Sequence, residues 1–162
     1  MSEKEFEIDI VNLIDEPKYI EEVSTLIWKQ WSSKHGATVE DIIYRTKHSL
    51  GKDMVPSMYI AKHENTLVGF VSLWTNDLVS RQDLYPWLST LYVKEEYRNL
   101  GIGKRLQYKC IEEAKKLGYK HLYLTSYHEN YYEKTGWSFM EKAPACDGRY
   151  KRIFVYDLED KN

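Results

Sequence analysis

The sequence has 162 residues, 43% of them hydrophobic, and a formal net charge of −2, so it is long enough for one domain with a buried core. A charge so close to zero gives no global basic field, which argues against nucleic acid as a partner. No apolar run approaches the roughly 20 residues that a membrane-spanning helix needs, and the charged N-terminus lacks the apolar core of a signal peptide. The two cysteines, Cys110 and Cys146, do not form a C-x-x-C pair, which argues against zinc and a disulfide framework. We therefore expect a single domain over residues 1–162, in the cytoplasm and without a metal.

Hydrophobic periodicity in the first half predicts both strands and helices. Asp15 is in position to cap a helix whose apolar residues recur at helical spacing. Thr38 and Asp41 resemble a capping box, which predicts the start of a second helix. The expected elements are a strand over residues 6–14, a helix from Asp15 through Trp31, a helix from Thr38 to Thr46, and an antiparallel hairpin of strands over 58–62 and 67–75.

The second half contains the clearest helix, which is expected over residues 101–117. Its apolar residues share one face, lysine and glutamate fill the other, and Gly118 ends it. The other expected elements are a loop over 76–86, strands over 87–93 and 121–125, a short helix over 130–135, and strands over 137–140 and 150–158. Hairpins combined with a strand–helix–strand unit predict an α/β (α+β) fold, with a mixed sheet and helices on both faces.

The most informative stretch runs from Leu91 to Lys104, where a strand enters a glycine-containing turn that opens the long helix. A helix N-terminus exposes unpaired N–H groups and partial positive charge, and glycines let an anion approach that backbone closely. Arg98 and Lys104 add positive charge there, which indicates a phosphate or pyrophosphate site. The alternative is an ordinary helix start. The Walker pattern is absent, and a dinucleotide-binding pattern would require glycine where Leu106 stands.

Two motifs in this sequence resemble those of the GNAT acetyltransferases. Arg98-x-x-Gly101-x-Gly103 is similar to the family's [QR]-x-x-G-x-[GA], and the segment from Tyr131 to Trp137 is similar to its F-Y-E-K-x-G-[FW]. The resemblance implies a mixed, mostly antiparallel central sheet with helices on both faces. It also implies direct acetyl transfer from acetyl-coenzyme A to a primary amine, on a small molecule, a peptide N-terminus or a lysine, with no metal.

The resemblance also implies which residues hold the coenzyme. The pyrophosphate is expected on the turn and the start of the helix, at Arg98, Asn99, Gly101, Ile102, Gly103 and Lys104. A bulge in the preceding strand would free backbone groups of Leu91 and Val93 for the pantetheine and the acetyl carbonyl. The backbone N–H of Leu91 would then stabilise the oxyanion of the tetrahedral intermediate.

Tyr132 matches the family's tyrosine that gives a proton to the departing thiolate, a role that suits a phenol because it is protonated at neutral pH. The simpler alternative is a packing tyrosine in a chain with 14 of them. No residue stands out as the base that takes a proton from the amine. The candidates are Asp77, Asp83, His128 and Glu129, each of which is also consistent with an ordinary surface residue.

The sequence is also consistent with two other functions. The chain could be a non-catalytic module that senses acetyl-coenzyme A, although the retained Tyr132 and intact glycine turn favour the enzyme. It could also bind another nucleotide, which the missing Walker residues argue against. The late strand over residues 150–158 is a candidate edge strand that could pair across a two-fold axis, so we expect a homodimer.

Overall fold

Seven strands form one sheet, in the order β1-β2-β3-β4-β5-β7-β6, in the computed structural model, which describes residues 6–159. The strands are β1 (Asp9–Asn12), β2 (Ser57–His63), β3 (Thr66–Trp74), β4 (Trp87–Val93), β5 (His121–Ser126), β6 (Ser138–Pro144) and β7 (Tyr150–Asp157). The helices are α1 (Ile20–Ile27), α2 (Val39–Lys47) and α3 (Ile102–Lys116).

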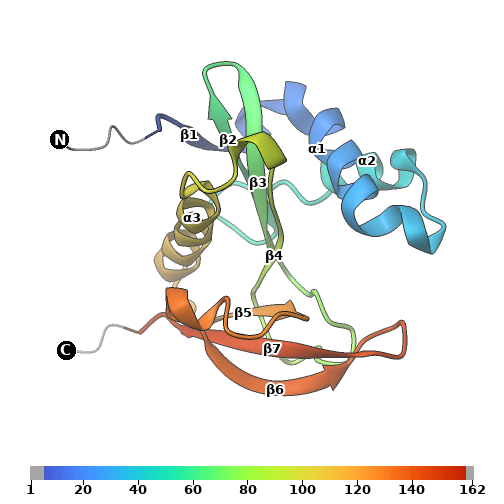
Figure 1. The fold of residues 1–162 in the computed structure, drawn as a ribbon, viewed down its shortest axis with the longest axis vertical. Helices are drawn as coiled ribbons and strands as arrows, with labels where there is room; N and C mark the ends of the chain where they lie inside the picture. Colours follow the sequence, from blue (N-terminus) through green and yellow to red (C-terminus); the bar gives the residue numbers. More distant parts are fainter. Residues whose placement is uncertain (1–5, 160–162) are drawn as a thin grey trace.

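All neighbouring strands are antiparallel except β4 and β5, which are parallel. Helix α3 covers one face of the sheet, and α1 and α2 cover the other (Figure 1). The predicted fold, a mixed and mostly antiparallel sheet with helices on both faces, is confirmed. None of the helices in the described part of the chain is long and apolar enough to cross a membrane.

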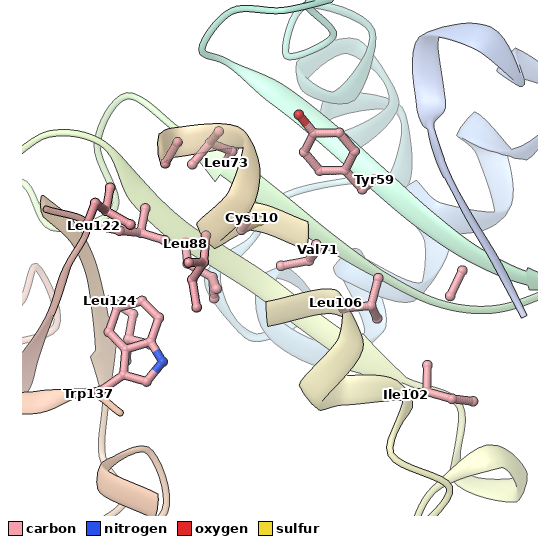
Figure 2. Packing of buried hydrophobic residues seen from close by; sticks show 14 of the residues in the cluster. Tyr59, Val71, Leu73, Leu88, Ile102, Leu106, Cys110, Leu122, Leu124 and Trp137 are labelled. Atoms are coloured by element: carbon pink, nitrogen blue, oxygen red, sulfur yellow. The ribbon is translucent and has the colours of Figure 1, made fainter. Parts of the chain in front are cut away.

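Helix α3 packs on the sheet through the apolar face that its periodicity predicts (Figure 2). Ile102, Leu106 and Cys110 are at most 2% exposed. Full burial of a side chain the size of Ile102 or Leu106 stabilises the fold by about 1.5–3 kcal/mol. Helix α3 packs against strand β3, whose Gly69 lets β4 and α3 come close to its backbone. A Cβ atom on Gly69 would lie 2.7 Å from the backbone oxygen of Tyr92, so the two strands could not keep this spacing with a larger residue.

On the other face, α1 and α2 cover a second apolar cluster. The predicted capping box of α2 is present. The Thr38 hydroxyl accepts from the Asp41 N–H at 3.1 Å, and the Asp41 carboxylate accepts from the Thr38 N–H at 2.8 Å. Together these bonds satisfy two of the N–H groups that a helix start leaves unpaired.

The predicted start of the first helix is wrong. Asp15 ends a short 3-10 turn that is capped by the Asn12 side chain, and α1 begins only at Ile20. The helix then widens into a π-helical segment, Trp28–Ser32, a form that often occurs at functional sites. The first strand is also shorter than predicted, because only Asp9–Asn12 pairs with β2.

Two expectations for the last third of the chain also need correction. The short helix expected over 130–135 is a single 3-10 turn, Glu133–Thr135. The final strand, β7, is not an edge strand, because it lies between β5 and β6. The homodimer stays a prediction, but β7 cannot supply the free edge on which that prediction was based.

Candidate active site

A bulge interrupts strand β4 at the middle of the sheet. Ser89 pairs with Ser72 and Tyr92 pairs with Phe70, so Thr90 and Leu91 together stand opposite one residue of β3. Thr90 has a φ of 45°, a left-handed conformation that is uncommon for a β-branched residue. The bulge expected before the glycine turn is therefore present, and it leaves Leu91 without a partner in the register of β3 and β4.

Strands β4 and β5 separate soon after they meet. Their parallel ladder contains only the pair Trp87–Tyr123, and Figure 1 shows the two strands running apart. A pocket of about 470 Å³ opens in this gap. Its wall consists of Ile27, Gln30, Trp31, Ser32, Arg45, Trp74, Asp77, Leu88, Ser89, Thr90, Leu91, Leu124, Thr125, Ser126, Tyr127, His128, Tyr132 and Lys151. Separated strands expose backbone N–H and C=O groups that a sheet would otherwise pair, so this wall can hydrogen-bond to an extended polar ligand.

The glycine turn follows β4 and leads into α3. Asn99 and Gly101 have φ values of 65° and 79°, and the N-cap residue of α3, Gly101, provides no side-chain cap. A Cβ atom on Gly103 would meet only the Cγ2 atom of Val93, at 3.8 Å. The first turn of a 15-residue helix thus has open space beside an uncapped, partially positive end, which fits a phosphate group.

The two predicted cations lie at this turn but make different contacts. Arg98 donates from Nε to the backbone oxygen of Val93 at 2.9 Å, which occupies one of the two lone pairs of that carbonyl oxygen. Its guanidinium also lies 5.8 Å from the Tyr92 ring centre. Lys104 is exposed and lies 5.8 Å from the ring of Tyr108.

Tyr132 brings its side chain into the wall of the pocket. Its ring lies 5.8 Å from that of Phe154 and 6.4 Å from that of Trp137. Burial, with a smaller effect of Tyr131, raises the pKa of Tyr132 to about 12, so the phenol is protonated at neutral pH. Its hydroxyl makes no hydrogen bond to any residue between 6 and 159, which leaves it available to donate to a ligand.

Comparison with known proteins identifies the family. The family model for the acetyltransferase (GNAT) family matches residues 20–137. The chain belongs to this family. It is therefore an acetyl-coenzyme A-dependent acetyltransferase, as its two motifs suggested. A search of curated protein sequences gives no significant match.

Solved structures agree on the fold of this acetyltransferase. An aminoglycoside 6'-N-acetyltransferase complexed with coenzyme A matches with a TM-score of 0.73 and 16% identity, over 95% of this chain and 99% of that one. An aminoglycoside 6'-acetyltransferase type Ii matches with a TM-score of 0.72 and 18% identity, over 96% and 99%. A GNAT-family acetyltransferase from Streptococcus pneumoniae matches with a TM-score of 0.70 and 19% identity, over 94% and 100%. At these identities the likeness shows the fold alone.

Asp77 is the only carboxylate in the wall of the pocket of the acetyltransferase. It accepts from the Ser89 hydroxyl of β4 at 2.8 Å and from the Thr125 hydroxyl of β5 at 3.2 Å. Asp77 thereby connects the two separated strands across the pocket. Burial raises the pKa of Asp77, and the two hydroxyls with Lys151 and Arg45 only partly oppose this effect.

The raised pKa of Asp77 predicts a pH-dependent stability. Between the unfolded-state pKa of about 4 and the higher native value, the native state binds the proton more tightly than the unfolded state. Stability due to this group is therefore lost as pH rises through that window. We expect the free energy of unfolding of the wild type to fall, relative to that of Asp77→Asn, as pH rises from about 4. Denaturant unfolding of both proteins across the pH range measures this difference.

Asp83→Asn is the matched control, with the opposite expected sign. Asp83 pairs with Arg81 at 2.9 Å, and this bond lowers the pKa of Asp83. The wild type should therefore gain stability relative to Asp83→Asn as pH rises, by a small amount because this carboxylate is 66% exposed. Parallel pH profiles for wild type and Asp77→Asn would contradict a raised pKa of Asp77 in the folded protein.

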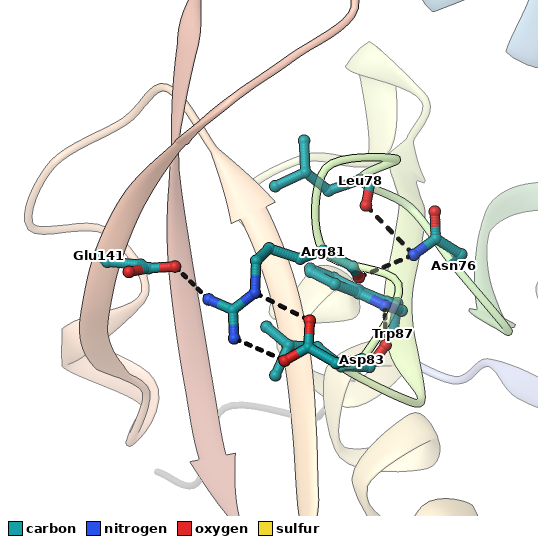
Figure 3. Close-up of polar contacts among 7 residues, drawn as sticks. Asn76, Leu78, Arg81, Asp83, Trp87 and Glu141 are labelled. Carbon is teal, nitrogen blue, oxygen red and sulfur yellow. Dashed lines mark hydrogen bonds and ion pairs between the residues drawn. The ribbon is translucent and has the colours of Figure 1, made fainter.

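The other candidate bases are less well placed. Figure 3 shows Asp83 and Glu141 on either side of Arg81, where they tie the loop before β4 to strand β6. Glu129 pairs with Arg152 and is not in the wall of the pocket. His128 is in that wall, so His128 and Asp77 are the two candidates that the structure brings to the pocket. No group of three or more His, Cys, Asp or Glu residues between residues 6 and 159 could hold a metal ion.

Several residues of the pocket were not predicted from the sequence. They are Gln30 and Trp31 from the π-helical segment, Arg45 from α2, Trp74 from the end of β3, and Lys151 from β7. None belongs to a motif, and they come from elements far apart in the chain. No local signal in the sequence could have found them, because a periodic pattern does not show which elements are neighbours.

Proposed function

We propose that this acetyltransferase transfers an acetyl group from acetyl-coenzyme A directly to a primary amine. The observation that carries the proposal is the pocket between β4 and β5, whose wall includes both Leu91 at the bulge and Tyr132. The strand that supplies the bulge continues into the uncapped N-terminus of α3. This arrangement places a site for phosphate groups, a pocket for the acetyl end of the coenzyme and a proton donor in one continuous region. Two structural neighbours are named as N-acetyltransferases or acetyltransferases of aminoglycosides, which supports an amine as acceptor.

The glycine turn would hold the coenzyme pyrophosphate. Ile102, Gly103 and Lys104 begin a helix that no side chain of the described residues caps, and their N–H groups would point at the phosphates. Arg98 and Lys104 would add charge, with Asn99 and Gly101 setting the left-handed backbone that shapes the turn. The pantetheine would run along the backbone of Leu91 and Val93.

Acetyl-coenzyme A supplies the acetyl group as a thioester. The Leu91 N–H would donate to the thioester oxygen as negative charge develops there during attack by the amine. A carbon–nitrogen bond forms, the carbon–sulfur bond breaks, and Tyr132 would give its phenolic proton to the departing thiolate. The proton that leaves the amine balances the one that Tyr132 supplies, and it would return to Tyr132 through water or through Asp77 or His128.

A panel of amines tests this function. We expect release of the coenzyme A thiol when acetyl-coenzyme A is mixed with the protein and aminoglycosides, polyamines, free amino acids or peptides with free N-termini. Calorimetry should show binding of acetyl-coenzyme A and none of ATP or NAD. Tight acetyl-coenzyme A binding without acetylation of any amine would favour the sensor instead. Preferred binding of ATP or NAD would overturn the assignment of the glycine turn.

A further inference from the structure

The pocket of this acetyltransferase contains more positive than negative side chains. Its wall includes the cations Arg45 and Lys151, the single carboxylate Asp77, and the titratable side chains of Tyr127, His128 and Tyr132. A polycationic acceptor entering this wall would meet two like charges and one opposite charge. Asp77 interacts electrostatically with both Arg45 and Lys151, but one carboxylate balances only one of the two cations. A like charge therefore remains, and the wall selects against such an acceptor.

Arg45 has hydrogen-bonding capacity that the protein does not use. It lies in the last turn of α2, and its guanidinium sits 5.0 Å from the Trp74 ring centre. It forms no ion pair and no side-chain hydrogen bond with the described residues. A guanidinium carries five N–H donors in a plane that matches a carboxylate, and here all five are left for water or a ligand.

Trp74 and Lys151 also carry hydrogen-bond donors without an acceptor among the described residues. The indole Nε1 of Trp74 is the only buried side-chain nitrogen or oxygen without a hydrogen-bond partner in the described part of the chain. An unpaired buried donor destabilises the folded protein, and functional sites are where such costs are tolerated. Lys151 lies 5.3 Å from the Tyr127 ring centre and has no ion pair with a described residue. Three side chains from three elements of the pocket wall, Arg45, Trp74 and Lys151, thus carry donors that have no acceptor among residues 6–159.

We infer that the acceptor is a small amine that also carries an anionic group, a carboxylate above all, which Arg45 and Lys151 bind. This inference rests on the proposed amine acetylation and adds the class of amine. The Asp77 carboxyl group, which is also in the wall, supplies a hydrogen-bond acceptor for the amino end of such a molecule. The pocket volume of about 470 Å³ must also contain the acetyl end of the coenzyme, so a free amino acid or a compound of similar size fits better than a long peptide.

Matched acceptors test the charge preference directly. For an apolar, a basic and an acidic amino acid, kcat/KM is measured for the free acid, the decarboxylated amine and the carboxamide. We expect the free acid to be preferred at least about tenfold over both analogues, since a charge-assisted bidentate hydrogen bond is lost in each. The carboxamide is the critical analogue, because its amine deprotonates more readily than that of the acid. Preference for the acid therefore cannot reflect the basicity of the amine. A dipeptide in the same series separates free amino acids from peptides.

Variants of the pocket residues test whether Arg45 and Lys151 cause the preference for the free acid. Arg45→Gln should reduce the preference for the free acid at least about tenfold, Lys151→Gln should reduce it as well, and Arg45→Lys should retain part of it. Lys47→Gln is the control, because Lys47 is an exposed cation on the same helix that is not in the pocket wall. Equal use of acid and decarboxylated amine by the wild type, or equal effects of Arg45→Gln and Lys47→Gln, would overturn the inference.

Binding measurements separate this inference from the proposed function. Calorimetry of the free amino acids with coenzyme A-loaded protein reports on the pocket without turnover. Carboxylate binding that depends on Arg45 supports the inference even if no amine is acetylated, a result that would overturn the proposed function alone. Acetylation of decarboxylated amines and polyamines in preference to acids supports the proposed function and overturns the inference.

Discussion

Replacing Gly103 with valine should weaken acetyl-coenzyme A binding at least tenfold, a loss of ~1.4 kcal/mol. The reason is that Gly103 stands in the first turn of α3, beside an N-terminus without a side-chain cap. The protein fills almost none of the space that a side chain would need there, since a Cβ atom meets only Val93 at 3.8 Å. A branched side chain in this space would exclude a phosphate from the helix N–H groups.

The fold itself should accept the substitution. Valine has a higher intrinsic helix propensity than glycine by a few tenths of a kcal/mol, so thermal stability should not fall. Glu112→Val is the control, because Glu112 is exposed on the same helix, away from the turn. Calorimetry with acetyl-coenzyme A should show a loss for Gly103→Val and none for Glu112→Val. Unchanged affinity in a folded Gly103→Val protein would remove the glycine turn from the coenzyme site.

Local sequence patterns were enough to predict the glycine turn and the helix that follows it, where we propose that the coenzyme binds. The apolar face of the helix over 101–117 and the glycines before it are near neighbours in the chain, so their spacing alone indicates a helix N-terminus. The capping box at Thr38 and Asp41 was confirmed for the same reason. The prediction of Asp15 as a cap failed because Asn12 caps an intervening turn, and a capping residue alone does not fix where a helix begins.

The residues that we propose bind the acceptor meet through contacts between distant elements, and the sequence could not predict these contacts. Asp77 meets Ser89 and Thr125 across 12 and 48 residues of sequence, and Arg45 and Lys151 enter the same wall from opposite ends of the chain. The strand over 150–158 was mistaken for an edge strand because pairing order is a property of the whole sheet. Periodicity reports which face of an element is buried, but not which elements are neighbours.

Replacing Tyr132 with phenylalanine should lower kcat by roughly 100-fold, within the range for a lost general acid. The substitution keeps the ring, which packs near Phe154 and Trp137, and removes only the hydroxyl. That hydroxyl has no hydrogen-bond partner among residues 6–159, so its removal leaves no protein group unsatisfied. If it protonates the thiolate, it acts in the transition state, and coenzyme affinity should change little.

The adjacent tyrosine provides the control for this experiment. Tyr131 is 54% exposed, lies outside the pocket wall, and has its ring centre 4.8 Å from that of Tyr132. Tyr131→Phe should therefore leave kcat near the wild-type value. Because the pKa of Tyr132 is about 12, its phenol should supply the proton throughout the neutral range, and the wild-type advantage over Tyr132→Phe should be the same at pH 6 and pH 8. Wild-type kcat in Tyr132→Phe with saturating acceptor would reduce Tyr132 to a packing residue. A change in acceptor KM alone would make it a residue that positions the substrate.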